Sequence, residues 1–174
     1  MIRSISLLFI LFAAPTIAEV PANYQRIGVI QQIPASILYS IAIQESRPPR
    51  GLIDGIDKPW PWTLNCDGQG YYFPTRQAAF NAASQFITSG GSCDIGLMQV
   101  NWNWHKQRFN SLNEALDPVT NIRAGSDYLK ELYIKSGSWE YAVGAYHSPS
   151  DSVKASQYRD KVRNHLARIM GVAF

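Results

Sequence analysis

Apolar residues recur at helical spacing through the stretch from Ile37 to Ser46, which reads I-L-Y-S-I-A-I-Q-E-S. Leu38 and Ile41 mark one face of the predicted helix, and Glu45 falls on the same face. The segment Arg47-Pro48-Pro49 ends the helix, because a residue before proline is pushed out of the helical region and proline has no amide hydrogen. The pattern therefore predicts a carboxylate in the last turn of an apolar helix.

Helical periodicity returns in four later segments. Thr75 and Asp117-Pro118 provide good N-cap and first-turn residues for two of these segments. Gly90-Gly91 and Gly137 follow the ends of the same two segments, where glycine is favoured. The four helices are expected over residues 75–88, 118–135, 139–146 and 153–170.

The chain on either side of the first predicted helix is expected to be irregular. Between Glu19 and Gln32 we expect an extended lead-in that becomes ordered where Tyr24 and Ile27 pack. From Arg47 to Lys58 the chain is rich in proline, glycine and aspartate, which is typical of a loop.

A small β-hairpin is predicted after that loop. Aromatic residues and prolines alternate at the period of a strand between Pro59 and Asn65. Alternating prolines cannot donate to a central ladder, so this segment is an edge strand at best. The residues from Asp67 to Gly70 favour a turn, and Tyr71 to Phe73 can return as the partner strand. The segment from Cys93 to Asn101 is expected to be short and tight.

The first 18 residues have the three-part layout of a secretory signal peptide. Arg3 precedes an apolar run from Ile5 to Phe12, and small residues follow up to Ala18. This run is too short to span a bilayer. We expect cleavage after Ala18 and one folded domain over residues 19–174; the alternative is an uncleaved membrane anchor.

Charge and cysteine content limit the function further. A formal net charge of +3 over 174 residues, with no dense stripe of lysine and arginine, argues against a nucleic-acid-binding protein. Two cysteines in an exported chain favour a disulfide between Cys66 and Cys93, and two free thiols are the alternative. The bond would close a loop of roughly 28 residues and contribute on the order of 3 to 4 kcal/mol.

No metal or other cofactor is expected. The three histidines, His105, His147 and His165, are isolated in the sequence, and with the two cysteines they show no metal-ligand spacing.

The position of Glu45 suggests acid catalysis. Burial on an apolar face raises the pKa of a carboxyl group, and the partial negative charge at a helix C-terminus raises it further. A carboxyl group that is still protonated near neutral pH can give a proton to a departing oxygen, as in cleavage of a glycosidic bond. The alternative is a glutamate that ends the helix and points to water.

Four separated motifs carry a resemblance to a known family. They are Glu45-Ser46, then Gly96-Leu97-Met98-Gln99, then Asn121-Ile122 with Gly125 and Tyr128-Leu129, and last Ala145-Tyr146. In this order they resemble the motifs of the soluble lytic transglycosylases. These are goose-lysozyme-like enzymes that cut the glycan strands of peptidoglycan. After Tyr146 the chain departs from the family, because His147-Ser148-Pro149 replaces the usual Asn-Ala-Gly.

The resemblance implies an α+β, mainly α-helical fold, a lysozyme-like domain with a small β-hairpin. It also implies a lytic transglycosylase over residues 19–174 that acts on peptidoglycan in the periplasm. Glu45 would be the catalytic residue, and the expected substrate-binding residues are Ser46, Gly96, Met98, Gln99 and Tyr146. Ser46 would contact substrate or support the glutamate.

The aromatic hairpin resembles that of the small specialised members encoded with conjugation, pilus or secretion systems. Components of such an apparatus are therefore possible partners. Trp60 and Trp62 could stack on sugar rings or simply pack under the hairpin.

Two other functions stay open at this point. A hydrolase would use a second carboxylate to activate water, and Asp54, Asp57, Asp67 and Asp94 are positioned for this in the predicted loops, although aspartate is also a common turn residue. A noncatalytic glycan-binding assembly protein would keep the groove without the chemistry.

Overall fold

The computed structural model describes residues 19–49 and 58–171. The predicted signal peptide, residues 1–18, lies outside these ranges. So does most of the predicted loop between Arg47 and Lys58, with Asp54 and Asp57.

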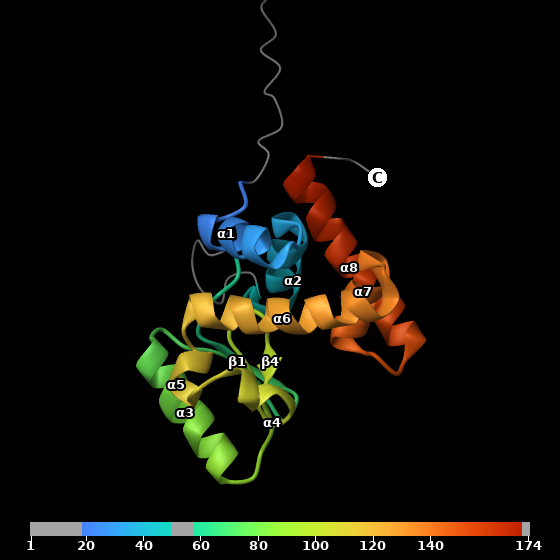
Figure 1. Ribbon diagram of the computed structural model, residues 1–174. Helices are drawn as coiled ribbons and strands as arrows, with labels where there is room; N and C mark the ends of the chain where they lie inside the picture. Colours follow the sequence, from blue (N-terminus) through green and yellow to red (C-terminus); the bar gives the residue numbers. More distant parts are fainter. Residues whose placement is uncertain (1–18, 50–57, 172–174) are drawn as a thin grey trace, which may run out of the picture.

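The described chain is mainly helical with one small sheet, which confirms the predicted α+β class (Figure 1). Helices α1, α2, α6, α7 and α8 make up one part, and the sheet with α3, α4 and α5 lies on the other side of α6. The helices are α1 (Ala22–Gln31), α2 (Ala35–Ser46), α3 (Arg76–Thr88), α4 (Trp102–His105), α5 (Leu112–Ala115), α6 (Pro118–Ser136), α7 (Trp139–His147) and α8 (Ser152–Met170), with a 3-10 turn at Lys106–Arg108. None of the helices within the described residues is long and apolar enough to cross a membrane.

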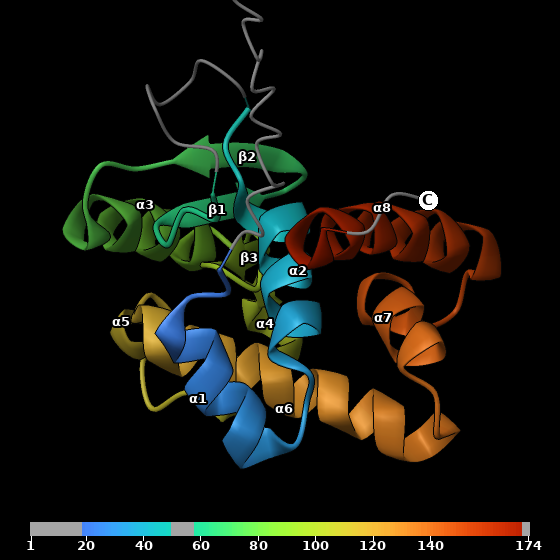
Figure 2. The ribbon, with the colours of Figure 1, turned by 90° about the horizontal axis from the view of Figure 1, so that it is seen from above.

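Helix α2 stands at the centre of the molecule (Figure 2), with α8 on one side and the sheet on the other. Leu38 and Ile41 on its predicted inner face have no exposed surface. The helix ends at Ser46, and Arg47 before the prolines is extended, with φ −70° and ψ 124°. The predicted helix, its buried face and its end are all confirmed.

The extended lead-in predicted before α2 is wrong, because Ala22–Gln31 forms helix α1. The predicted packing of Tyr24 and Ile27 is confirmed, since both side chains are buried. Val29 and Ile30 are 80% and 72% exposed, so the apolar residues of α1 do not keep to one face. Gln32, with φ 56°, ends the helix in the left-handed region.

The sheet is antiparallel, with strand order β2-β1-β3-β4. The strands are β1 (Thr63–Cys66), β2 (Gln69–Tyr72), β3 (Cys93–Ile95) and β4 (Val100–Asn101). The hairpin of β1 and β2 is confirmed, and Asp67 and Gly68 form its tight turn, both with positive φ. The prediction of an edge strand is wrong, because β1 starts after the prolines and pairs on both sides.

The predicted disulfide is confirmed. Cys66 and Cys93 are direct partners on the neighbouring strands β1 and β3, and their sulfurs are bonded. Both side chains are buried, so the cross-link ties the hairpin to the segment that leads into β4.

Helix caps confirm two more predicted helices. The side chain of Thr75 accepts a hydrogen bond from the amide of Ala78 at the start of α3, and that of Asp117 accepts from Thr120 at the start of α6. Gly137, with φ 68°, ends α6 as predicted.

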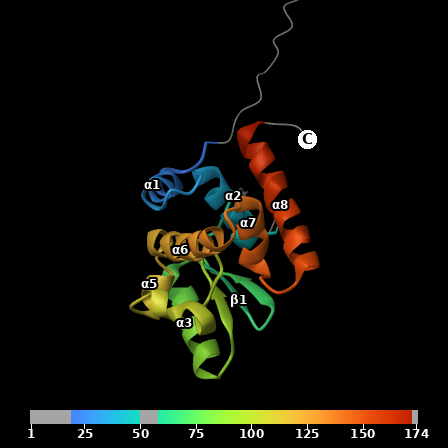
Figure 3. The same cartoon turned by 45° about the vertical axis from the view of Figure 1, so that its right-hand side comes forward.

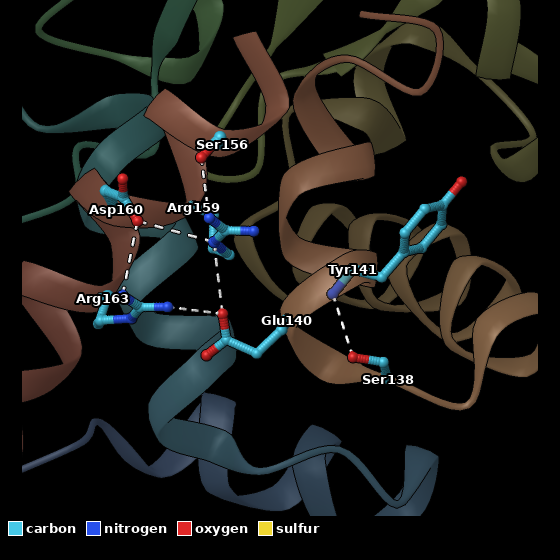
Figure 4. Close-up of polar contacts among 7 residues, drawn as sticks. All are labelled: Ser138, Glu140, Tyr141, Ser156, Arg159, Asp160 and Arg163. Atoms are coloured by element: carbon cyan, nitrogen blue, oxygen red, sulfur yellow. Dashed lines mark hydrogen bonds and ion pairs between the residues drawn. The ribbon is translucent and has the colours of Figure 1, made fainter. Parts of the chain in front are cut away.

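Helices α7 and α8 are also joined by charged groups on their outer face (Figure 4). The carboxylate of Glu140 lies 2.8 Å from the guanidinium of Arg163 and 3.4 Å from that of Arg159. Glu140 and Arg163 are exposed and Arg159 is partly buried, so these ion pairs are expected to add only modestly to stability beside the apolar packing of the two helices. In Figure 3, α8 lies on the opposite side of α2 from α1.

We predict that a double substitution, Cys66→Ser with Cys93→Ser, lowers the free energy of unfolding by about 3 kcal/mol, since the unfolded chain loses a cross-link across a sequence separation of 27 residues. Urea unfolding of the two proteins under oxidising conditions measures the difference. Adding a reductant should lower the stability of the parent to that of the variant. Equal stability of the two oxidised proteins would contradict the prediction.

Candidate active site

The turn between β3 and β4, Gly96-Leu97-Met98-Gln99, is the place where the predicted motifs meet. Gly96 has φ +77°, and a Cβ atom there would lie 2.6 Å from Nδ2 of Asn121. Both facts require glycine. Gln99 also has a positive φ, 45°, which is unusual for a residue with a side chain.

Asn121, from the third motif, lies on α6 and forms hydrogen bonds with this turn and with the residue before it. Its Oδ1 accepts a hydrogen bond from the amide of Met98 at 2.8 Å, and its Nδ2 donates to the carbonyl oxygens of Ile95 and Ala115. The side chain of Asn121 is fully buried and cannot contact water, so these hydrogen bonds satisfy its polar atoms.

Tyr146 and Gly125 hold the same turn from the side of α6 and α7. The hydroxyl of Tyr146 donates to the carbonyl oxygen of Met98 at 2.8 Å. A Cβ atom on Gly125 would lie 2.6 Å from Cβ of Met98 and 2.9 Å from the hydroxyl oxygen of Tyr146. The glycine therefore allows α6 to pack directly against the turn.

Ser46, at the end of α2, also forms a hydrogen bond with this turn. Its hydroxyl group lies 2.9 Å from the carbonyl oxygen of Leu97 and 2.9 Å from that of Ala42, one turn back in α2. The side chain is fully buried. Of the two roles expected for Ser46, its position fits support of the neighbouring Glu45 and does not fit contact with a substrate.

Glu45 lies in the wall of an open pocket of about 690 Å³. Gln99 and Tyr146 line the same pocket, whereas Ser46, Gly96 and Met98 are buried and do not line it. The structure thus separates the predicted site residues into three that line the pocket and three that do not. The other lining residues are Asn65, Asp94, Val100, Asn101, Trp104, His105, Tyr128, His147, Pro149 and Ser150.

The surroundings of Glu45 raise its pKa to about 7. Burial is the main cause, and the nearby carboxylate of Asp94 acts in the same direction. The hydroxyl of Tyr158 donates a hydrogen bond to Oε1 of Glu45 at 2.5 Å, which favours the ionised form and lowers the pKa. The balance leaves a carboxyl group that can both give and take a proton near neutral pH.

The sequence did not indicate the contact with Tyr158, which lies on α8. The ring of His147 stacks on that of Tyr158, with centroids 4.8 Å apart and an angle of 6° between the rings. His147 is the residue after the Ala145-Tyr146 motif, where the chain departs from the pattern of the lytic transglycosylases that it resembles. The sequence did contain an indication that Tyr158 has a partner. Tyr158 lies on the apolar stripe of its helix, and a buried tyrosine needs a hydrogen-bond partner for its hydroxyl group.

Asp94 is the second carboxylate in the pocket. Nδ2 of Asn101 donates to its Oδ1 at 2.8 Å, and burial raises the pKa of Asp94. Asp67 lies instead in the exposed hairpin turn, where its Oδ1 accepts from the amide of Ser92. Within the described residues, no group of three or more histidine, cysteine or acidic side chains is placed to hold a metal ion.

Comparison with known proteins gives a family. The profile described as Transglycosylase SLT domain matches residues 75–167, just over half of the chain. Glu45 and Ser46 lie before the matched stretch, and the other three motifs lie within it.

Two curated relatives match the chain over stretches of similar length to one another. The Invasion protein IagB of Salmonella typhimurium (strain SL1344) is 28% identical over 112 residues, which cover 59% of this chain and 69% of IagB. Protein IpgF of Shigella flexneri is 26% identical over 103 residues, which cover 54% of this chain and 66% of IpgF. No solved structure matches at a comparable level of significance.

We predict that Gly125→Ala destabilises the protein by about 1 to 3 kcal/mol, because the new methyl group overlaps Met98 and Tyr146. Replacing glycine with alanine at an unobstructed helix position would instead stabilise the protein. A loss of stability would therefore show that the space around Gly125 is filled. Chemical denaturation measures it. Gly70→Ala is the control, because the nearest atom to a Cβ there is 4.0 Å away. A loss no larger in Gly125→Ala than in Gly70→Ala would contradict the packing described.

The raised pKa of Glu45 predicts a pH-dependent cost in stability. Between the ordinary pKa, 4.5, and about 7, the folded protein keeps a proton on Glu45 that the unfolded chain releases. Stability due to this group therefore falls as pH rises through that window. Relative to the parent, Glu45→Gln should gain on the order of 2 to 3 kcal/mol between pH 4.5 and pH 8. Urea unfolding at the two pH values checks this, and a constant difference would show that the pKa is not raised.

Proposed function

Since this chain belongs to the Transglycosylase SLT domain family, we propose that it is a peptidoglycan lytic transglycosylase. It cleaves the β-1,4 bond between N-acetylmuramic acid and N-acetylglucosamine without water and leaves 1,6-anhydro-N-acetylmuramic acid ends. The observation that supports this best is Glu45, a carboxyl group with a pKa raised to about 7 in the wall of the family's expected groove.

In the first step, the protonated carboxyl group of Glu45 gives its proton to the glycosidic oxygen. The bond from that oxygen to C1 of the muramic acid breaks, and positive charge develops on C1 and the ring oxygen. The acetamido oxygen of the same sugar stabilises this charge, so the first step needs no second protein carboxylate.

In the second step, Glu45 is a carboxylate and takes the proton from the 6-hydroxyl of the muramic acid. The oxygen of that hydroxyl attacks C1 and closes the anhydro ring, and Glu45 returns to its protonated form. The hydrogen bond from Tyr158 stabilises the carboxylate between the two steps. One group can serve as acid and then as base because its pKa lies near the working pH.

The pocket residues position the sugar for this reaction. Gln99 lies in the wall of the pocket, and its Nε2 donates to the carbonyl oxygens of Gly96 and Thr63, which holds its side chain in place. Tyr146 presents its ring to the pocket, while its hydroxyl is engaged with Met98.

The cellular role follows from the resemblance to the small specialised members of the family. We place the catalytic domain over residues 19–174, exported to the periplasm by the signal peptide 1–18. We propose that it opens the wall locally for a conjugation, pilus or secretion apparatus; one of its relatives, IagB, is named an invasion protein.

A hydrolase remains the second candidate, and the observation in its favour is Asp94. Its carboxylate lines the same pocket as Glu45 and influences the pKa of that residue. In this reaction Asp94 would activate a water molecule, and the product would have a reducing muramic acid end.

We predict that the protein covering residues 19–174 releases anhydro-muropeptides from purified peptidoglycan and that Glu45→Gln lowers this release at least 1,000-fold, about 4 kcal/mol of barrier, because amide groups cannot transfer the proton. Mass spectrometry of the soluble products is the measurement.

Asp94→Asn serves as the matched control, since it removes the second carboxylate and keeps the side-chain shape. Anhydro products from Asp94→Asn support the transglycosylase, whereas reducing products from the parent that vanish in Asp94→Asn support the hydrolase. No products from the parent or from either variant would favour a glycan-binding protein.

A further inference from the structure

A second pocket meets the pocket described above at Glu45. It has a volume of about 120 Å³ and lies where α8 runs beside α2 (Figure 2). Glu45 and His147 line both pockets, so a group bound in the second one would lie next to the candidate catalytic residue. We call it the α8 pocket, and its other lining residues are Gln44, Lys154, Gln157, Tyr158 and Lys161.

One face of α8 supplies most of this lining. Lys154, Tyr158 and Lys161 are separated by four and three residues, so their side chains lie on the same side of the helix. His165, one turn further on, helps to fix this face against α2, since its Nε2 lies 3.3 Å from Oε1 of Gln44. Two lysine side chains therefore reach the pocket from a helix that is held in place.

The acidic residue in the middle of α8 does not neutralise this pocket. Asp160 pairs with Arg159 and Arg163 at 3.6 Å each, on the side of α8 that faces Glu140 of α7 (Figure 4). These charged groups compensate one another away from the α8 pocket.

Lys161 has the less compensated charge of the two lysines. Lys154 lies 3.5 Å from Asp151 at the start of α8. In the part of the chain that the structure describes, Lys161 forms no ion pair. Burial lowers the pKa of His147, and the positive charge of Lys161 lowers it further. The ammonium group of Lys161 is therefore close to the site and available to an anion.

The sugar that would react at Glu45 carries an anionic substituent. Muramic acid differs from glucosamine by a lactyl ether on C3, in the same ring as the C1 that reacts in the proposed mechanism. In bare glycan strands the lactyl group ends in a carboxylate, and in strands with peptide stems the carboxylates belong to the peptide. Lysine binds a carboxylate as a compact charge with three hydrogen-bond donors. A neutral N-acetylglucosamine unit offers no such group.

We propose that the α8 pocket is a specificity site that binds a carboxylate of the muramic acid substituent, with Lys161 as its main charged group and Lys154 beside it. It selects muramic acid over N-acetylglucosamine in the ring next to Glu45 and takes no part in bond cleavage. This proposal deepens the proposed function and rests on it for the identity of the polymer.

The test measures binding apart from catalysis, by isothermal titration calorimetry of protein covering residues 19–174 that carries Glu45→Gln. Two probes are tetrasaccharides of alternating N-acetylglucosamine and N-acetylmuramic acid, one with free lactyl carboxylates and one with peptide stems. The third probe is chitotetraose, which is neutral. We expect Lys161→Gln to weaken binding of an anionic probe about fivefold, and Lys161→Arg, which keeps the charge, to bind within about twofold of the parent. Binding of chitotetraose should not change.

Lys135→Gln is the matched control. Lys135 is also exposed and lies in the last turn of α6, and it lines neither of the two pockets that meet at Glu45. The substitution removes the same charge, so it measures the effect of net charge alone. Because Lys161 is exposed, Lys161→Gln should also unfold at the same temperature as its parent.

The outcomes separate this proposal from the reaction itself. A loss confined to Lys161→Gln supports the site even if the products prove to be reducing sugars. A loss with the bare tetrasaccharide assigns the pocket to the lactyl carboxylate, and a loss with the peptide-bearing one assigns it to the stem. Unchanged affinity for both anionic probes, or an equal loss in Lys135→Gln or for chitotetraose, overturns the proposal even if anhydro products are found. No detectable binding of either anionic probe by the parent would also overturn it.

Discussion

The candidate site depends on how the polar backbone groups of one buried turn are satisfied. Residues 96–98 of this turn are buried, so their amide and carbonyl groups need partners. Three side chains from distant parts of the chain provide them: Ser46 for Leu97, Asn121 for both Ile95 and Met98, and Tyr146 for the carbonyl of Met98. Loss of any one partner would leave a buried group unpaired, which costs about 1 to 3 kcal/mol.

This turn also explains the position of Glu45. Since Ser46 is tied to Leu97, the last turn of α2 is fixed against the motif turn. The preceding residue then reaches the pocket, where burial favours its protonated form and Tyr158 favours its ionised form. A hydrogen bond from a neutral hydroxyl can be kept in both protonation states, whereas an ion pair with a basic residue would hold the group ionised. The choice of partner thus suits the proposed reaction, in which Glu45 would change its charge twice in one cycle.

Local signals predicted the elements whose ends are fixed by neighbouring residues. The Thr75 and Asp117 caps and the proline stop after Ser46 needed no information from elsewhere in the chain. Strands β3 and β4 could not be found in this way, because three and two residues are too few to show a period. Helix α1 was missed for another reason, since its exposed valine and isoleucine obscure the buried face.

For the candidate site, too, the sequence indicated some features and not others. The motifs named residues that the structure brings together around one turn, but they did not show which of them face the pocket, because burial is decided by elements far away in sequence. The contact between Glu45 and Tyr158 joins residues 113 positions apart.

The motifs that identify the family are therefore mainly those that build the turn, and a glycan-binding protein could keep all of them. Evidence for catalysis has to come from side chains that do not stabilise this turn. The glutamate is one such group, since neither its burial nor its bond to Tyr158 stabilises the motif turn. Its ionisation is opposed by the fold, with a pKa of about 7 in place of 4.5. A glutamine there would avoid this cost and keep the shape of the helix, so the carboxyl group is best explained by a need for proton transfer.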